Sequence, residues 1–366
     1  MDRDPEGATG EHHAARPAEA HAHWAWPARK GMRAVNIALQ GGGAHGAFTW
    51  GVLDRLLEED RLVIEAISGT SAGAVNAVVL AEGLHRGGPA EARRRLEEFW
   101  KAVSIGGNAS ELQQSMLDVL LSNWNLENNP FLAMFEMMSR VVSPYQFNPL
   151  NLNPLKELLE ASVDFDAVRA CQCIELFVSA TNVHTGRVRV FTTEEMTADA
   201  VMASACLPFL FQAVEIDGEH YWDGGYMGNP AIFPIIYSSA SKDVVLVHVN
   251  PIERPQLPVT ASDIFNRIND ISFNSSLMRE IRAIAFVTRL IDAGHLDAST
   301  YSRMRIHAVR NDADMARLGV ASKFSPDWDF LAGLRDAGRA EAAKWLEGTF
   351  DLIGEQSSID VDDTYL

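Results

Sequence analysis

The fold of this chain is decided by the stretch Leu62-Val63-Ile64-Glu65-Ala66-Ile67-Ser68-Gly69-Thr70-Ser71-Ala72-Gly73. Its first half is apolar and rich in β-branched residues, which predicts a buried strand. The residues from Ala74 to Leu84 are rich in alanine, valine and leucine, which predicts a helix. A strand, a Gly-x-Ser-x-Gly turn and a helix form the setting of a nucleophile elbow, which presents Ser71 at the strand tip. The alternative is a small-residue turn in which Ser71 caps the helix.

A second glycine-rich turn comes earlier in the chain. Ala34–Leu39 is expected to be the first strand, and the loop Gln40-Gly41-Gly42-Gly43-Ala44-His45-Gly46 follows it, ahead of an amphipathic helix. Backbone N–H groups of such a loop can bind an anion at a helix N-terminus. One interpretation is an oxyanion hole, to which the elbow would add the N–H of the residue after Ser71. The contributing residues would be Gly41, Gly42, Gly43 and Ala72.

The same loop permits a dinucleotide-binding interpretation. Gly41, Gly43 and Gly46 match the pattern Gly-x-Gly-x-x-Gly, and Glu65 lies near the expected distance for a ribose-binding carboxylate. We favour the oxyanion hole, because the next strand ends in the elbow and so brings Ser71 to the same sheet edge as the glycine loop. A lone Gly-x-Gly-x-x-Gly is a weak signal.

The later part of the chain continues the alternation of strands and helices. Val214–Trp222 reads as a hairpin with an Asp-Gly turn, and it leads into Asp223-Gly224-Gly225. Val244–Asn250 is expected to be a buried strand, residues 262–293 a helix, and Arg303–Val309 the last strand. This alternation predicts an α/β fold with a mainly parallel sheet between helices.

Composition bounds the partners and cofactors of the protein. The net charge of −18 disfavours nucleic acid and electrostatic docking on anionic lipid, although hydrophobic contact with a membrane surface stays open. The cysteines Cys171, Cys173 and Cys206 are few and odd in number, which predicts buried thiols in a reducing compartment. No Asp-rich loop has calcium-ligand spacing, so no cofactor and no metal are expected.

The chain is expected to form one domain over residues 32–350 with a tail at each end. Residues 1–31 are rich in Ala, Pro, Glu and His and read as a disordered tail, and residues 351–366 read as a mobile acidic tail. Residues 106–154 read as a helical insertion, whose methionines suit either a cap over an acyl pocket or ordinary core helices. Neither a signal peptide nor a transmembrane helix is expected, which predicts a cytoplasmic protein with at most peripheral membrane contact.

Three blocks of the sequence resemble the signature blocks of the patatin-like phospholipases. They are Gly41-Gly42-Gly43-Ala44-His45-Gly46, Gly69-Thr70-Ser71-Ala72-Gly73 and Asp223-Gly224-Gly225, and Ala203-Ser204-Ala205-Cys206-Leu207-Pro208 is similar to a further block. The resemblance implies a three-layer fold and a lipid acyl hydrolase of the phospholipase A or lysophospholipase kind. It also implies that Ser71 is the nucleophile and Asp223 its base in a catalytic dyad. The family often has arginine where this chain has His45, and a neutral histidine would stabilise an oxyanion less.

The proposed dyad sets a condition on Asp223. A carboxylate in water, with a pKa of about 4, is a poor base for a hydroxyl group. Burial beside Trp222 and Tyr226 would raise its pKa and make it a better base. The alternative role for Asp223 is that of an ordinary turn aspartate before glycines.

A Ser-His-Asp triad remains an alternative to the dyad. The order Ser71, Asp223, His248 matches that of α/β-hydrolases, although His248 lies inside an expected apolar strand where a core histidine is typical. His184 and His220 lie at turns. Three classes of function therefore stand: a lipid acyl hydrolase, a triad esterase or depolymerase acting on non-lipid esters, and a non-hydrolytic nucleotide-binding protein. The sequence leaves the oligomeric state open.

Overall fold

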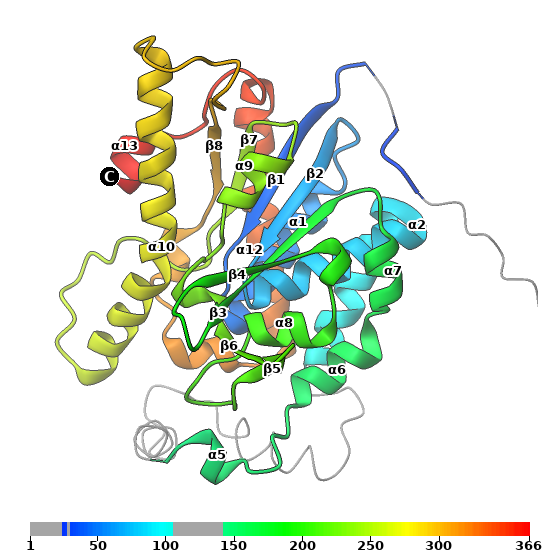
Figure 1. Cartoon of the computed structure of the whole chain (residues 1–366), viewed down its shortest axis with the longest axis vertical. Coiled ribbons are helices and arrows are strands. Elements are labelled where there is room, and N and C mark those ends of the chain that lie inside the picture. Colours follow the sequence, from blue (N-terminus) through cyan, green and yellow to red (C-terminus); the bar gives the residue numbers. More distant parts are fainter. Residues whose placement is uncertain (1–23, 28–29, 105–141) are drawn as a thin grey trace, which may run out of the picture.

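A mixed, mainly parallel sheet runs through the molecule (Figure 1). The structure is a computed structural model that describes residues 24–27, 30–104 and 142–366. The strands of the sheet are β1 (Arg33–Leu39), β2 (Leu62–Gly69), β3 (Glu175–Asn182), β4 (Val188–Thr192), β5 (Val214–Ile216), β6 (Glu219–Asp223), β7 (Asp243–Val247) and β8 (Arg305–Val309). Their spatial order is β5-β6-β3-β2-β1-β7-β8, with β4 paired to β3.

Helices cover both faces of the sheet (Figure 1). The α-helices are α1 (Gly46–Leu56), α2 (Ala72–Val103), α5 (Pro144–Phe147), α6 (Pro154–Ser162), α7 (Phe165–Ala170), α8 (Ala198–Ser204), α9 (Phe233–Ser238), α10 (Ala261–Asp292), α11 (Asp312–Met315), α12 (Trp328–Thr349) and α13 (Val361–Tyr365). Short 3-10 turns that matter for the site are η1 (Gly43–His45), η4 (Gly224–Tyr226) and η5 (Val320–Phe324).

Residues that alternate along the central strands face two separate cores. In β1, Ile37 and Leu39 pack into the core that α1, α2 and α12 share, whereas Ala38 belongs to the core under α9 and α10. In β7, Val245 faces the first core and Leu246 the second. Because successive strand residues point to opposite faces, apolar runs such as these require helices on both sides. The expected mainly parallel sheet between helices is therefore confirmed.

The register of the strands brings three chain segments to one edge of the sheet. The parallel strands β1 and β2 end side by side, with Leu39 opposite Gly69. Strand β3 continues past this level, where its Ala180 pairs with Asp223 at the end of the antiparallel strand β6. The glycine loop after β1, the elbow after β2 and the turn after β6 therefore leave the sheet close together.

The C-terminal segment differs from the mobile tail that its charge suggests. Ile353 is buried, α13 packs beside α10, and the Tyr365 ring is buried with its hydroxyl 2.6 Å from Nε2 of His248. The acidic residues of the segment cap and flank α13, so that its apolar positions are free to dock. The acidic composition of the segment did not predict that its apolar residues pack against the domain.

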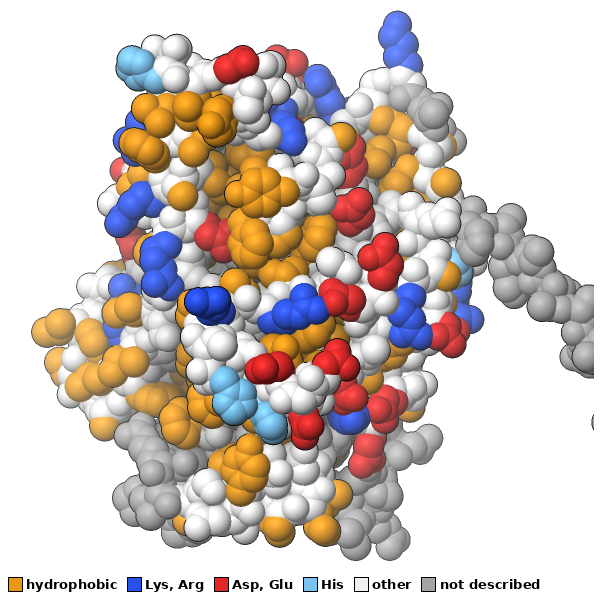
Figure 2. Space-filling view, viewed as in Figure 1, with side chains coloured by type: hydrophobic (Ala, Val, Ile, Leu, Met, Phe, Trp, Pro, Cys, Tyr) orange, Lys and Arg blue, Asp and Glu red, His pale blue; other side chains and the backbone are white. Residues whose placement is uncertain are grey.

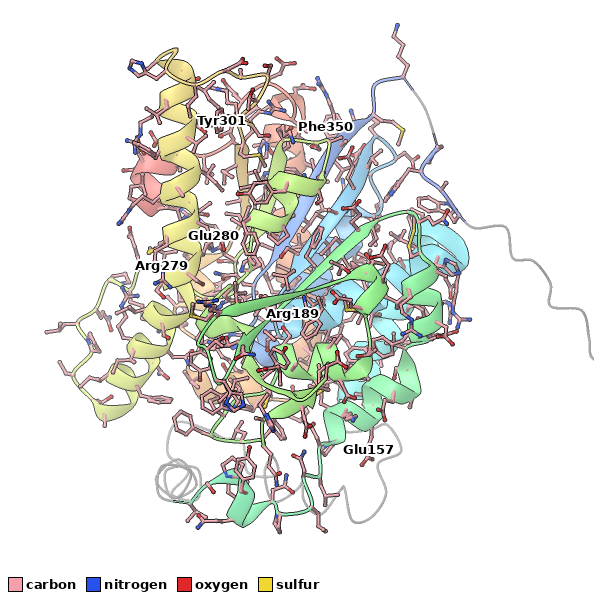
Figure 3. The ribbon with its side chains drawn as sticks, in the orientation of Figure 1. Glu157, Arg189, Arg279, Glu280, Tyr301 and Phe350 are labelled. Atoms are coloured by element: carbon pink, nitrogen blue, oxygen red, sulfur yellow. A yellow bond between two sulfur atoms is a disulfide. The ribbon has the colours of Figure 1, made fainter. Side chains whose placement is uncertain are left out.

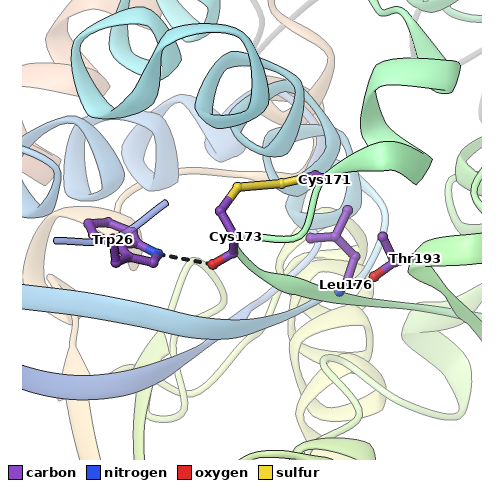
Figure 4. The surroundings of a disulfide bond; sticks show 5 residues. All are labelled: Trp26, Cys171, Cys173, Leu176 and Thr193. Carbon is purple, nitrogen blue, oxygen red and sulfur yellow. Dashed lines mark hydrogen bonds between the residues drawn. A yellow bond between two sulfur atoms is a disulfide. The ribbon is translucent and has the colours of Figure 1, made fainter. Parts of the chain in front are cut away.

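The expectation of free thiols at Cys171 and Cys173 is also corrected. The two residues are joined by a disulfide (Figure 4). Cys206 is free and buried. One intervening residue leaves their Cα atoms 5.6 Å apart, which lies within the range that a disulfide spans. The indole N–H of Trp26 donates to the carbonyl of Cys173 at 3.0 Å, which ties the start of the described chain to β3.

Two expectations fall outside the described residues. The tail over residues 1–31 is described only at residues 24–27 and from residue 30 onward, and the insertion near residues 106–154 only from residue 142 onward. Within the described ranges, no helix is both long and apolar enough to cross a membrane. The same ranges contain no cluster of three His, Cys, Asp or Glu side chains arranged to hold a metal ion.

Candidate active site

Ser71 occupies a strained turn between β2 and α2. Its φ of 53° and ψ of −120° lie outside the regions that side-chain-bearing residues ordinarily adopt. The flanking glycines permit the turn, because a Cβ at Gly69 would lie 2.6 Å from the carbonyl oxygen of Gly73. Ser71 does not cap α2 with its side chain, and its side chain is partly exposed. The geometry is that of a nucleophile elbow rather than of a capping turn.

The glycine loop lies directly against the elbow. A Cβ at Gly41 would come within 2.7 Å of the Cβ of Ser71 and within 2.9 Å of the carbonyl oxygen of Thr70. A buried amide holds the loop in this place, because Oδ1 of Asn229 accepts the N–H of Gly41 at 2.7 Å. Nδ2 of Asn229 donates to the carbonyl of Phe273 on α10, which fixes the orientation of the amide.

The carbonyl groups of the loop point away from its remaining N–H groups. The carbonyl of Gly41 accepts a hydrogen bond of 2.7 Å from Nδ2 of Asn250, and the carbonyl of Gly42 accepts the N–H of His45. In a trans peptide the C=O and the following N–H point in opposite directions. Among the described residues, the N–H groups of Gly42, Gly43 and Ala72 form no hydrogen bond. The N–H of Gly41, by contrast, is already occupied.

Asp223 reaches the site at the end of β6 and is almost completely buried. Its Oδ1 accepts the N–H of Gly225 at 2.7 Å, whereas the buried Oδ2 has no hydrogen bond of ordinary geometry within the described chain. Burial raises the pKa of Asp223 to about 7. The Gly225 N–H, the nearby hydroxyl of Ser71 and the charge of Lys323 each counteract part of this rise. The condition that the sequence placed on Asp223 is met.

The block Ala203-Ser204-Ala205-Cys206-Leu207-Pro208 holds both candidate catalytic residues. Oγ of Ser204 accepts the backbone N–H of Ser71 at 2.8 Å, and the carbonyl of Cys206 accepts the backbone N–H of Asp223 at 2.8 Å. Burial raises the pKa of Cys206 to about 12, so it is a thiol and not a thiolate at neutral pH. The block therefore holds the backbone of Ser71 and of Asp223 in place, a role that its resemblance to a family block did not predict.

Lys323 is a partly buried cation behind the glycine loop. Its Nζ donates to Oδ1 of Asn250 at 2.8 Å and to Oδ1 of Asn269 at 2.9 Å, and burial lowers its pKa to about 8. Asn250 is the same residue whose Nδ2 holds the carbonyl of Gly41. The backbone carbonyl of Lys323 also packs against the loop, since a Cβ at Gly43 would lie 2.2 Å from its oxygen.

His45, which stands where the family often has arginine, is uncharged. Burial, with a smaller contribution from Lys323, lowers its pKa to about 3. Its Nε2 lies 2.8 Å from Oγ of Ser322, and Ser322 donates its own hydrogen to the carbonyl of Gly319, so His45 is the donor in this pair. Positive charge near His45 comes from Lys323, which follows Ser322 in η5, and from Arg254, whereas His45 itself is neutral.

The other candidate histidines have hydrogen-bond partners of their own. Burial lowers the pKa of His248 to about 3, and its Nε2 is bonded to the hydroxyl of Tyr365 in the core under α13. His184 and His220 lie 3.4 Å apart, nitrogen to nitrogen, at the turn end of the β3–β4 and β5–β6 hairpins.

Glu65 lies in a different environment from that of a ribose-binding carboxylate. Its Oε2 accepts hydrogen bonds from the hydroxyl of Ser239 and the N–H of Ser241, in the loop between α9 and β7. That loop leads into the amino end of β7, at the opposite end of the sheet from the glycine loop. Glu65 is therefore not in a position to bind the ribose of a dinucleotide held by the glycine loop.

The sequence matches the family model described as patatin-like phospholipase over residues 37–236, which is more than half of the chain. The chain therefore belongs to the patatin-like phospholipase family, a family of lipid acyl hydrolases. The matched range contains the glycine loop, Ser71 and Asp223 but ends before Asn250 and Lys323.

Solved structures of two bacterial proteins are similar to this chain at low identity. VipD from Legionella pneumophila is 16% identical, with 85% of this chain and 66% of VipD covered, at a TM-score of 0.39. ExoU, solved in complex with SpcU from Pseudomonas aeruginosa, is 16% identical, with 87% and 52% covered, at a TM-score of 0.34. This chain thus spans just under two thirds of the VipD chain and about half of the ExoU chain. A comparison with curated proteins found no match.

Four residues of the site escaped the sequence reasoning. Asn229 and Asn250 are buried polar residues, Lys323 is partly buried, and Ser204 lies in a block noted only for its resemblance. The signal that could have found Asn229 is its place before a proline, shortly after Asp223-Gly224-Gly225. Nothing in the local sequence marks Lys323, because its role depends on where η5 packs.

Proposed function

We propose that this protein hydrolyses the acyl ester bonds of lipids, as a phospholipase A or lysophospholipase, with Ser71 as nucleophile and Asp223 as general base. The observation that carries the proposal is the pairing of a strained, partly exposed serine with a buried carboxylate whose Oδ2 has no other hydrogen-bond partner in the described chain. A pKa of about 7 makes this carboxylate a far better proton acceptor than a solvated aspartate, while leaving much of it ionised at neutral pH.

The reaction would proceed through an acyl-enzyme. Oγ of Ser71 attacks the ester carbonyl carbon while Oδ2 of Asp223 accepts the hydroxyl proton. The tetrahedral intermediate collapses, the C–O bond to the lipid alcohol breaks, and the alcohol leaves with the proton from Asp223. Water then attacks the acyl-enzyme and gives a proton to Asp223, which returns it to Ser71 as the fatty acid departs.

The N–H groups of Gly42 and Gly43, with that of Ala72, are the donors that we assign to the oxyanion. This assignment is supported by the lack of a hydrogen bond on these three N–H groups among the described residues. It is also supported by the hydrogen bonds that the carbonyls of Gly41 and Gly42 accept. Gly41 belongs to the same loop, but its own N–H donates to Asn229, so its part is to let the loop approach Ser71. Donors fixed in advance in this way stabilise the developing charge without reorganising.

Lys323 would supply the charge that the neutral His45 lacks. A cation held behind the loop favours the oxyanion and the ionised form of Asp223 together. Its bond to Asn250 also fixes the amide that orients the Gly41–Gly42 peptide. The departure from the family pattern at His45 would thus be compensated by a residue far away in the sequence.

A panel of purified-protein assays tests the proposal. We expect hydrolysis of phospholipids or lysophospholipids, with fatty acid released, and covalent labelling by a fluorophosphonate probe. The label should map to Ser71 by mass spectrometry of the digested protein. Labelling together with hydrolysis of short p-nitrophenyl esters alone would point to a non-lipid esterase. Tight nucleotide binding by calorimetry with no labelling would contradict the hydrolase.

A further inference from the structure

One face of α10 carries apolar and basic side chains from end to end. Ile264, Ile268 and Ile271 are 44%, 60% and 54% exposed, and Phe286 is 57% exposed about four to six turns further on. At about 100° of rotation per residue, these four side chains and those of Arg279 and Arg282 fall within a sector about 80° wide. We call this set the α10 stripe: Ile264, Ile268, Ile271, Arg279, Arg282 and Phe286. The sector also contains Ser275 and Arg289, of which Arg289 pairs with Asp362.

The acidic residues of α10 all lie away from the stripe. Asp270 is buried against Arg254, and Glu280 accepts the backbone N–H groups of Ile232 and Phe233. Asp263 accepts the hydroxyl hydrogen of the capping residue at the helix start, and Asp292 pairs with Arg303 at the helix end. The helix therefore has no net charge, and its acidic and basic side chains lie on different faces.

The arginines of the stripe are unpaired. Neither Arg279 nor Arg282 has a carboxylate within 4.0 Å among the described residues, although acidic groups outnumber basic ones in this chain. Figure 3 shows Arg279 on the side of α10 that faces away from the sheet, and Glu280 on the side that faces α9. Figure 2 shows hydrophobic side chains over the N-terminal part of α10, with Lys and Arg side chains beside them along the helix.

We propose that the α10 stripe docks this protein on a lipid bilayer that contains anionic headgroups, an inference that rests on the proposed function. A helix with an apolar and arginine-rich face lies in the plane of the interface, with its apolar side chains among the acyl chains. The isoleucines would enter the bilayer, and Arg279 and Arg282 would meet lipid phosphates. Leu257 and Val259, exposed in the loop that leads into α10, extend the apolar end of this surface.

The net charge of −18 does not prevent this contact. At physiological salt, charges further away than about 8 Å are largely screened, so the headgroups respond to the side chains that touch them. Each arginine near an anionic surface favours binding, and the stripe brings two of them with no acid between. The net charge of the whole chain therefore does not by itself exclude docking through this face of α10.

The helix that carries the stripe also supports the candidate active site from its other face. Asn269 accepts a hydrogen bond from Lys323, and the ring of Phe273 packs against Gly225 beside Asp223. Docking through the outer face of α10 would therefore bring the surroundings of Ser71 close to the lipid from which the substrate comes.

Vesicle binding by the full chain tests the proposal without depending on catalysis. Protein carrying Ser71→Ala would be sedimented with vesicles of phosphatidylcholine containing a minority of phosphatidylglycerol. Replacing Arg279 and Arg282 by glutamine is expected to weaken the partition coefficient about tenfold or more. Ile268→Asp is expected to weaken it by a similar factor, on both mixed and pure phosphatidylcholine vesicles.

Matched substitutions elsewhere on the surface control for charge and for folding. Arg187 and Arg317 are exposed on segments other than α10, and their joint replacement by glutamine removes the same charge. Ala340 is exposed on α12, so Ala340→Asp adds the same carboxylate as Ile268→Asp. Both controls are expected to bind within twofold of the Ser71→Ala parent, and all variants should melt cooperatively near the parent temperature.

Unchanged binding by both stripe variants would overturn the proposal, and so would failure of the Ser71→Ala parent to bind any vesicle. In the latter case, light scattering that shows a dimer lost on Ile268→Asp would assign the stripe to a second copy of this chain. Docking and catalysis can fail separately. Stripe-dependent binding without lipid hydrolysis by the wild type would remove the proposed function alone, and lipid hydrolysis without stripe-dependent binding would remove the docking surface alone.

Discussion

The two halves of the candidate active site come from regions of different character. Residues 37–236, which match the family model, bring Ser71, Asp223 and the glycine loop to one sheet edge. The remainder of the chain brings Asn250, the partly buried Lys323 and helix α10 behind them. The first region supplies atoms that would react or donate to the oxyanion, and the second sets their position and charge. A family motif can therefore be complete while the environment that makes it work lies elsewhere in the chain.

Removing the nucleophile should have the largest effect. Ser71→Ala deletes one partly exposed oxygen, and we expect kcat on any ester substrate to fall by about 10⁴-fold or more, since the nucleophile has no substitute. Fluorophosphonate labelling should disappear, while the circular dichroism spectrum and Tm should stay close to those of the wild type. A variant that keeps most of the wild-type rate would mean that Ser71 belongs to the turn and not to the chemistry.

Removing the base should have the next largest effect. Asp223→Asn keeps the size of the side chain but cannot accept a proton, so kcat should fall by about 10³-fold. The wild-type rate should fall as the pH drops below about 7, the pKa to which burial raises Asp223. His248→Gln is the matched test of a triad, and it should keep kcat within about tenfold once folding is checked. A folded but inactive His248→Gln protein would favour the triad.

The same carboxylate should cost stability at high pH. Because its pKa is raised in the folded protein, ionised Asp223 is less favourable when folded than when unfolded, and the native state loses stability as the pH rises toward and past 7. Asp223→Asn should therefore melt a few degrees above the wild type at pH 8, and the difference should shrink below pH 4. Calorimetry at both values checks this, and equal Tm values at pH 8 would mean that Asp223 is not held in a desolvated site.

Gly43 lies where the first region contacts the second, because the glycine loop packs there against Lys323. Its substitution should have a smaller effect than loss of either dyad member. Gly43 has a φ of 59°, and a Cβ there would lie 2.2 Å from the carbonyl oxygen of Lys323. Gly43→Ala should push the loop away from η5 and reduce kcat about 100-fold with little change in KM, as loss of an oxyanion donor does. Gly333→Ala on α12 meets nothing within 4 Å and should leave both constants unchanged. A rise in KM with an unchanged kcat would mean that the loop binds the substrate and does not stabilise the oxyanion.

The first region could be predicted from the sequence because its signals are local. A strand, a glycine turn and a helix follow one another within a few residues, and parallel strands bring such turns to one edge. The packing of the C-terminal segment and the disulfide between Cys171 and Cys173 could not be predicted in this way. Composition suggested a mobile tail and free thiols, whereas tertiary contacts decided otherwise. The position of Lys323 likewise depends on how η5 folds back onto the loop.

Removing the charge of Lys323 gives the sharpest test of the contribution of the second region. Lys323→Met should lower kcat about tenfold near neutral pH, a smaller loss than that of an oxyanion donor. Because the cation lowers the pKa of Asp223, its loss should move the acidic limb of the pH–rate profile to higher pH. Lysine itself loses its charge above a pKa of about 8, so the difference between variant and wild type should shrink at alkaline pH.

Two further variants separate the charge of Lys323 from its hydrogen bonds. Lys323→Gln can still donate to Asn250 or Asn269 without a charge, so it should shift the acidic limb as Lys323→Met does while keeping more of kcat. Lys242, which donates to the carbonyl of Ser239 at the other end of the sheet, provides the control, and Lys242→Met should leave the profile in place. A Lys323→Met protein with a lower Tm but an unshifted acidic limb would mean that Lys323 only packs. In that case the charges that act on the site would come from residues 37–236 alone, and the second region would only support the site by packing.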